Sequence, residues 1–188
     1  MQALLVSLVT VFLGEMGDKT QLLAILLAAR FRRPWVIIAG IFIATLANHT
    51  VAGAVGTWLS ETLPPVVLLW GVALSFIAVG LWALRPDKVE DAEAQRTGSA
   101  LGVTIVSFFL AEIGDKTQIA TAVLAARFDS LAEVVAGTTL GMLLADAPVV
   151  FLGSALAGRL PLKATRAAAA TLFIVLGVTT LFVGLARS

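Results

Sequence analysis

Apolar residues run through this chain in six long stretches that are separated by short polar breaks. The stretches cover residues 3–29, 35–59, 64–84, 99–127, 131–158 and 164–186. Each is long enough to supply the ~20 residues that a membrane-spanning helix needs. The pattern therefore predicts an all-α integral membrane protein with six transmembrane helices.

The longest break, residues 86–98, is rich in charge and predicts a cytoplasmic linker between a first repeat, 1–85, and a second, 99–188. Shifting the chain by 97 residues aligns the two halves without a gap, and 14 of the 23 positions in 9–31 are identical in the second copy. Each repeat would hold three helices, so the second copy would insert upside down. Inverted repeats with a binding site near the midplane are a transporter architecture.

The loop charges predict the orientation of these helices. Nine Lys and Arg residues lie in the first, third and fifth breaks: Arg30, Arg32, Arg33, Arg85, Lys88, Arg96, Arg159, Lys163 and Arg166. The opposite side holds only Arg127 and Arg187. Because the positive side of a membrane protein faces the cytoplasm, both termini are expected to be extracytoplasmic.

Composition supports a membrane protein and excludes several other classes. The 188 residues are 59% hydrophobic and 13% charged, with a mean hydropathy of +0.99, whereas soluble domains carry roughly a quarter charged residues. A net charge of +1 gives no general attraction to nucleic acid. The absence of cysteine excludes disulfides and thiolate metal sites. Oxygen ligands and one histidine remain, which suit hard or intermediate cations.

The most informative feature is an acidic motif that occurs twice inside apolar segments. Glu-Met-Gly-Asp-Lys-Thr-Gln at 15–21 returns as Glu-Ile-Gly-Asp-Lys-Thr-Gln at 112–118. Ionisable groups are expensive in hydrocarbon, so carboxylates at such positions indicate a functional site. On a continuous helix the polar residues of each copy would share an arc of about 160°. Gly17 and Gly114 would allow close helix approach, or a local break that frees backbone carbonyls.

The charges of the two motifs suggest what such a site could bind. Four carboxylates and two lysines sum to −2 when all are ionised, and either one divalent cation or two protons would neutralise that charge. This equivalence is a chemical basis for exchanging a divalent cation for protons. A purely structural alternative is a pair of ion pairs, Glu15–Lys19 and Glu112–Lys116, which hold helices together. Uncharged residues would do this more cheaply in hydrocarbon.

A second group of polar residues lies in the middle of two other segments. Asn48 and His49 are in the second segment and Asp146 is in the fifth, where the 97-residue shift aligns it with His49. Pro148 removes one backbone hydrogen bond of that helix and can open it locally. These residues are expected to serve as a proton relay or to support the site, although a simple packing role for His49 stays open.

The two copies of Glu-hydrophobic-Gly-Asp-Lys-Thr resemble the signature of the Gdt-type family of Ca²⁺/Mn²⁺:H⁺ antiporters, and the resemblance covers the whole chain. It implies that Glu15, Asp18, Glu112 and Asp115 are the cation ligands. Lys19, Thr20, Lys116 and Thr117 complete the signatures, while Gln21 and Gln118 extend them and are candidate amide-oxygen ligands. The bacterial members of this family resemble Mn²⁺ exporters, so the expected location is a prokaryotic inner membrane.

The expected function is therefore export of Mn²⁺ or Ca²⁺ in exchange for protons, by alternating access to a midplane carboxylate site. Moving a positive charge out of a negative interior costs ~2.3 kcal/mol per 100 mV, so export needs a coupled inward flow. No resident cofactor and no enzymatic activity are expected. Two alternatives stay open: an intramembrane metalloenzyme that uses the carboxylates to hold a catalytic metal, and a passive cation channel.

Overall fold

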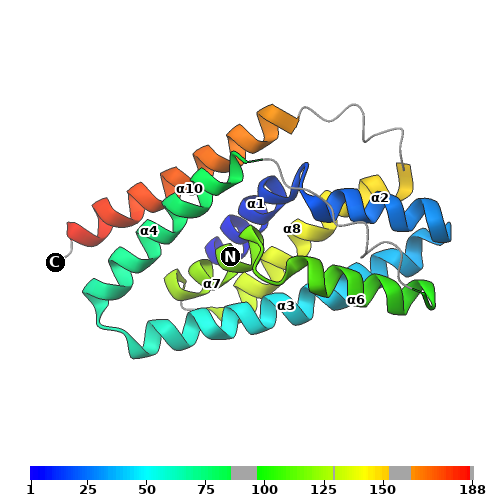
Figure 1. The fold of residues 1–188 in the computed structure, drawn as a ribbon. Helices are drawn as coiled ribbons and strands as arrows, with labels where there is room; N and C mark the ends of the chain where they lie inside the picture. Colours follow the sequence, from blue (N-terminus) through cyan, green and yellow to red (C-terminus); the bar gives the residue numbers. More distant parts are fainter. Residues whose placement is uncertain (86–96, 129, 153–161, 187–188) are drawn as a thin grey trace.

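The computed structural model describes residues 1–85, 97–128, 130–152 and 162–186, and within these ranges the secondary structure is entirely α-helical (Figure 1). The helices are α1 (Gln2–Glu15), α2 (Lys19–Phe31), α3 (Pro34–Thr62), α4 (Pro65–Ala83), α6 (Ala100–Glu112), α7 (Lys116–Arg127), α8 (Leu131–Leu152) and α10 (Leu162–Leu185). The all-α prediction is confirmed. Most of the predicted linker, and the end of the predicted fifth segment, lie outside the described residues.

Four of the described helices are long and apolar enough to cross a membrane: α3, α4, α8 and, over Arg166–Gly184, α10. The first segment of each half differs from the prediction. Residues 3–29 and 99–127 were expected to form continuous helices, but each is divided into two helices at its acidic motif. α1 and α6, with 14 and 13 residues, are each too short to span the hydrocarbon alone.

The helices divide here because a glycine changes the direction of the backbone and an aspartate starts a new helix. Gly17 and Gly114 have φ angles of 81° and 72°, in the left-handed region that residues with a Cβ rarely adopt. Asp18 and Asp115 then occupy the N-cap positions of α2 and α7. The expected arc of polar residues on one continuous helix is therefore wrong, and the alternative of a local break is what the structure shows.

Each break is also closed by a glutamine side chain. The side-chain oxygen of Gln21 accepts a hydrogen bond from the backbone N–H of Gly17 at 2.9 Å, and Gln118 does the same for Gly114 at 2.8 Å. An aspartate at the N-cap with a glutamine three residues later is close to a capping box, although the glutamine here bonds the residue before the cap. The last four residues of the motif, Asp-Lys-Thr-Gln, thus encode a helix start.

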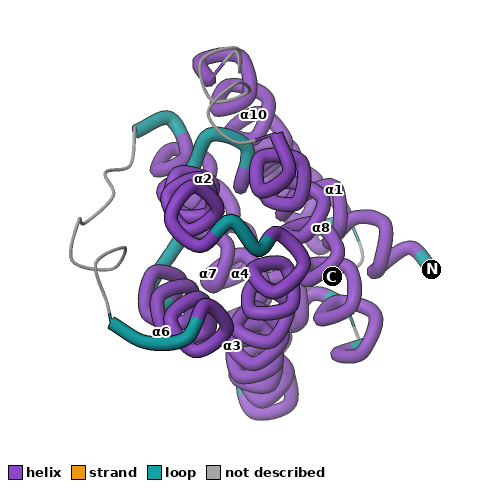
Figure 2. The backbone as a smooth tube through the Cα atoms, turned by 90° about the vertical axis from the view of Figure 1, so that its right-hand side faces the viewer, coloured by secondary structure: helices purple, strands orange, loops and turns teal. Residues whose placement is uncertain are grey.

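The helices of the two halves pack against one another rather than within separate halves (Figure 2). α1 lies along α8, while α6 and α7 lie along α3, and α4 pairs with α10. A Cβ added at Gly137 or Gly141 of α8 would collide with the backbone of α1 near Leu4 and Leu8. These two glycines therefore serve close helix packing inside the bundle.

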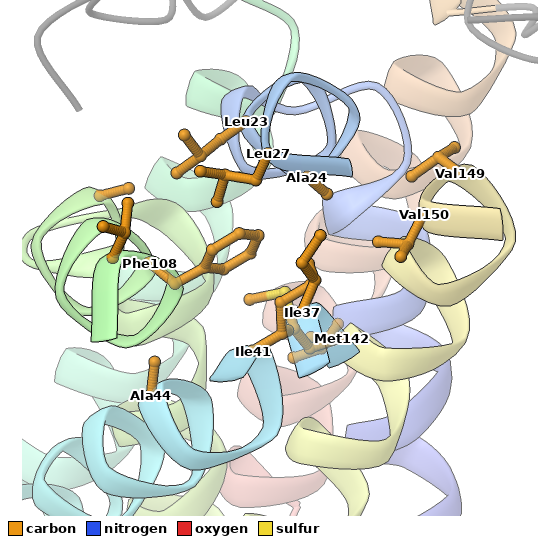
Figure 3. Close-up of a cluster of buried hydrophobic side chains, with 13 residues drawn as sticks. Leu23, Ala24, Leu27, Ile37, Ile41, Ala44, Phe108, Met142, Val149 and Val150 are labelled. Carbon is orange, nitrogen blue, oxygen red and sulfur yellow. The ribbon is translucent and has the colours of Figure 1, made fainter. Parts of the chain in front are cut away.

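An apolar cluster joins helices of both halves, including helices that adjoin the two breaks (Figure 3). Leu23 and Leu27 of α2 meet Ile41 of α3, Phe108 of α6 and Met142 of α8, and all five side chains are at most 1% exposed. In lipid, where the surroundings are as apolar as leucine, such contacts stabilise mainly through close van der Waals packing. The cluster fixes α2 against α6 and so holds the two helix breaks together.

Candidate cation site at the two helix breaks

Three carboxylates from the two halves converge at the breaks. Glu15 is the last residue of α1, Asp18 begins α2, and Asp115 begins α7. One oxygen from each lies within 4.8 Å of the other two. All three are buried in the bundle. The structure therefore brings three of the four acidic residues of the motifs to a single point.

Two ion pairs cross from one half to the other at the same place. Lys19 Nζ lies 3.3 Å from Asp115 Oδ1, and Lys116 Nζ lies 3.2 Å from Asp18 Oδ2. The structural alternative expected pairs between residues four apart on one helix. Instead each lysine pairs with the aspartate of the opposite half.

Hydroxyl groups orient the two glutamates. Thr20 Oγ1 donates to Glu15 Oε2 at 2.5 Å, and Thr45 Oγ1 of α3 donates to Glu112 Oε1 at 2.8 Å. His49 Nε2 lies 3.8 Å from Glu112 Oε2. Glu112 is thus held beside α3, outside the group of three carboxylates. Thr45 was missed by the sequence analysis, because a threonine in an apolar helix carries no signal of its own.

The glutamines link the breaks to the neighbouring helices. Gln21 Nε2 donates to the Ala145 carbonyl of α8 at 3.0 Å, and Gln118 Nε2 donates to Asn48 Oδ1 of α3, also at 3.0 Å. Asn48 in turn donates to the Phe109 carbonyl of α6 at 2.9 Å. Both glutamine oxygens accept backbone hydrogen bonds at the breaks, and an amide oxygen has a second lone pair that could meet a cation.

Thr117 and Asp146 complete the set of predicted residues. Thr117 is buried at the start of α7, where its hydroxyl donates to Asp115 Oδ2 at 3.3 Å. Asp146 is buried in α8, and neither of its carboxylate oxygens has a hydrogen-bond partner among the described residues.

Discontinuous helices suit such a site for electrostatic reasons. The C-terminal ends of α1 and α6 leave backbone carbonyls without helical partners, and carbonyl ends of half-helices can coordinate cations. The N-terminal ends of α2 and α7 carry partial positive charge, and a capping aspartate lies at each of them. Carboxylate, carbonyl and amide oxygens are the donors that Ca²⁺ and Mn²⁺ prefer.

A buried set of oxygen donors at paired helix breaks, inside a bundle with long apolar helices, is an arrangement typical of membrane transporters of cations. The chain belongs to the family described as the divalent cation/proton antiporter GDT1, whose model matches residues 3–91 and again residues 100–188. The resemblance stated from the doubled motif is thereby confirmed.

Similar proteins occur in bacteria and plants. A Vibrio cholerae protein named "Putative manganese exporter" is 47% identical over 97% of this chain and 92% of its own length. A GDT1-like protein of Synechocystis is 30% identical over 92% of this chain and 93% of its own. GDT1-like protein 5 of Arabidopsis thaliana is 26% identical, over 93% of each chain. No solved structure matches this chain.

Proposed function

We propose that this protein exports Mn²⁺, Ca²⁺ or both from the cytoplasm in exchange for protons, by alternating access to the carboxylates at the helix breaks. The observation that carries the proposal is the convergence of Glu15, Asp18 and Asp115 within 4.8 Å in a buried position. Membership of a divalent cation/proton antiporter family and the name of the Vibrio cholerae relative support it.

Protons are the natural counter-ion because the same groups can hold either species. When the cation leaves, the clustered carboxylates would repel one another in a medium of low dielectric constant, and protonation relieves that repulsion. A bound cation and a full set of bound protons then exclude each other, because both occupy the same carboxylates. Exclusive binding at one site that opens to either side in turn is sufficient for coupled exchange.

We further propose that the two halves are inverted repeats, with both termini outside the cytoplasm. The packing of the helices supports this arrangement. α1 of the first half packs on α8 of the second, and the equivalent helix of the second half, α6, packs on α3 of the first. This reciprocal pattern is what a two-fold relation between halves would produce. The proposed location is the inner membrane of a prokaryotic cell.

Flux measurements in sealed liposomes test the exchange. Purified protein should drive Mn²⁺ uptake into liposomes whose interior is acidic, and an inward Mn²⁺ gradient alone should drive protons out when no pH gradient is imposed. A passive channel would carry Mn²⁺ without obligatory proton movement. Flux of Mn²⁺ that leaves the internal pH unchanged, with a proton-sensitive dye as reporter, would reject the antiporter.

Cysteine labelling tests the orientation, since the natural chain has no cysteine. In intact cells, Glu61→Cys at the end of α3 should react with a membrane-impermeant thiol reagent, whereas Asp91→Cys in the predicted linker should react only after the cells are opened. Labelling of Asp91→Cys in intact cells would rule out the proposed topology.

A further inference from the structure

Among the described residues of the predicted site, Asp146 has a carboxylate with no hydrogen-bond partner at either oxygen. Its side chain is 0% exposed. A buried polar group without a hydrogen-bond partner is destabilising, and more so if it is charged. α8 is otherwise apolar around it, so an aspartate at this position needs a reason.

The equivalent position in the other half indicates where Asp146 acts. A shift of 97 residues relates His49 to Asp146 and Glu15 to Glu112. His49 contacts Glu112, with 3.8 Å between Nε2 and Oε2. If the halves are related in this way, Asp146 faces Glu15. Like Glu112, Asp146 lies outside the group of three carboxylates whose oxygens are within 4.8 Å of one another, but it interacts electrostatically with Glu15 and Asp18 of that group.

A direct contact fixes this part of α8 beside the first helix break. The side-chain amide of Gln21 donates to the carbonyl of Ala145, the residue next to Asp146, at 3.0 Å. Gln21 also accepts from the backbone N–H of Gly17 at 2.9 Å. The Ala145–Asp146 turn is therefore linked through one side chain to the turn that places Glu15 and Asp18.

We infer that Asp146, whose two carboxylate oxygens are held by no hydrogen bond among the described residues, is a fourth carboxylate ligand that joins Glu15, Asp18 and Asp115 when the transported cation binds. This inference rests on the proposed cation site. Ca²⁺ takes six to eight oxygen ligands, so a fourth carboxylate that lacks another partner fits the demand of the ion. The half-site at Glu15 is then rich in carboxylates, while the half-site at Glu112 offers a histidine at the equivalent position.

Replacing the ligand by a thiol tests direct coordination in a chain that has no other cysteine. Asp146→Cys in the purified full-length protein should bind Cd²⁺ through its thiolate and give the ultraviolet charge-transfer absorption of a sulfur–metal bond, because soft metals favour thiolate. Asp115→Cys is the positive control for the proposed site. Leu144→Cys, on the same helix but 52% exposed, is the negative control.

The outcomes separate the inference from the site on which it rests. Absorption in both Asp146→Cys and Asp115→Cys, but not in Leu144→Cys, supports coordination by Asp146. Absorption in Asp115→Cys alone overturns the inference and leaves the site intact. Absorption in neither variant rejects the proposed cation site, and the inference with it.

Binding of Mn²⁺ gives a second test that does not depend on the folding of the cysteine variant. Asp146→Asn should lower the affinity for Mn²⁺ at least about tenfold. Loss of a group that hydrogen-bonds to a metal ligand already weakens metal binding by about that factor, and loss of a ligand itself should weaken it no less. Asp146→Glu, which keeps the carboxylate, should stay closer to the natural protein. Unchanged Mn²⁺ affinity in Asp146→Asn would overturn the inference.

Discussion

The two acidic motifs are almost identical in sequence, yet they lie in different surroundings. Glu112 is held by Thr45 and approached by His49, both from α3. Glu15 is held by Thr20 of its own motif and ends α1, which packs along α8, the helix that contains Asp146. A duplicated motif can therefore build two chemically different half-sites, because the helix that each copy meets has diverged. The function of a repeat depends on its neighbour as much as on its own residues.

The largest expected effect is loss of transport when a capping aspartate is neutralised. Asp18→Asn and Asp115→Asn each remove one member of the carboxylate cluster and one ion pair with a lysine of the opposite half. Mn²⁺ uptake by proteoliposomes should fall below detection in both variants. Asp91→Asn in the linker is the matched control and should transport normally. Full transport by one variant from each half would contradict a shared site.

The two lysines should differ in their contribution to stability, because their exposure differs. The side chain of Lys116 is 5% exposed and that of Lys19 is 25% exposed. Breaking a buried ion pair costs about 3–5 kcal/mol, while an exposed pair contributes about 1 kcal/mol or less. Lys116→Met should lower the melting temperature in detergent clearly more than Lys19→Met. The reverse order would show that the burial of the lysine does not determine how much stability is lost when its ion pair is broken.

Acidification should weaken cation binding to the half-site at Glu15. Protons and a divalent cation compete for the same carboxylates, so the affinity for Mn²⁺ falls as the pH falls. If one proton is bound for each cation released, affinity drops about tenfold per pH unit, and two protons would steepen this. Equilibrium binding measured from about pH 5 to pH 8 provides the test. A flat profile is incompatible with exchange at a shared site.

The smallest expected effect concerns the hydroxyls that orient the two glutamates. Thr20→Val and Thr45→Val each remove one hydrogen bond to a carboxylate and keep the shape of the side chain. A loss of about 1.5 kcal/mol corresponds to roughly a tenfold change at most. Thr20→Val should weaken Mn²⁺ binding more than Thr45→Val, since Glu15 is in the carboxylate cluster and Glu112 is outside it. Equal effects would mean that both glutamates hold the ion alike.

Much of the fold followed from hydropathy, because a lipid environment leaves a backbone few choices. The apolar segments predicted α3, α4, α8 and α10 closely. Pro34 and Pro65, at the ends of two polar breaks, are the first residues of α3 and α4. The breaks at Gly17 and Gly114 were only one of two options, since an apolar helix tolerates a glycine. The spacing of Asp18 and Gln21 was the available signal: an aspartate followed three residues later by a glutamine is typical of a helix start, so it favours a broken helix over a continuous one.

The composition of the site was easier to predict than its connections. Ionisable residues in apolar segments identified every charged group at the breaks. Their partners depend on tertiary packing: nothing local indicates that Lys19 meets Asp115, or that Gln21 reaches Ala145. The separate position of Glu112 likewise follows from Thr45, whose importance appears only when α3 lies beside α6.

The crossed lysine–aspartate pairs also bear on how the protein is made. When the first half leaves the ribosome, its broken helix carries an aspartate and a lysine whose partners have not yet been synthesised. That segment is a poor candidate for stable residence in lipid until the second half arrives. Each half is therefore an incomplete intermediate, and assembly is complete only when the two are interlocked. A truncated chain would therefore place an aspartate and a lysine in the bilayer without the ion pairs that they form across the two halves.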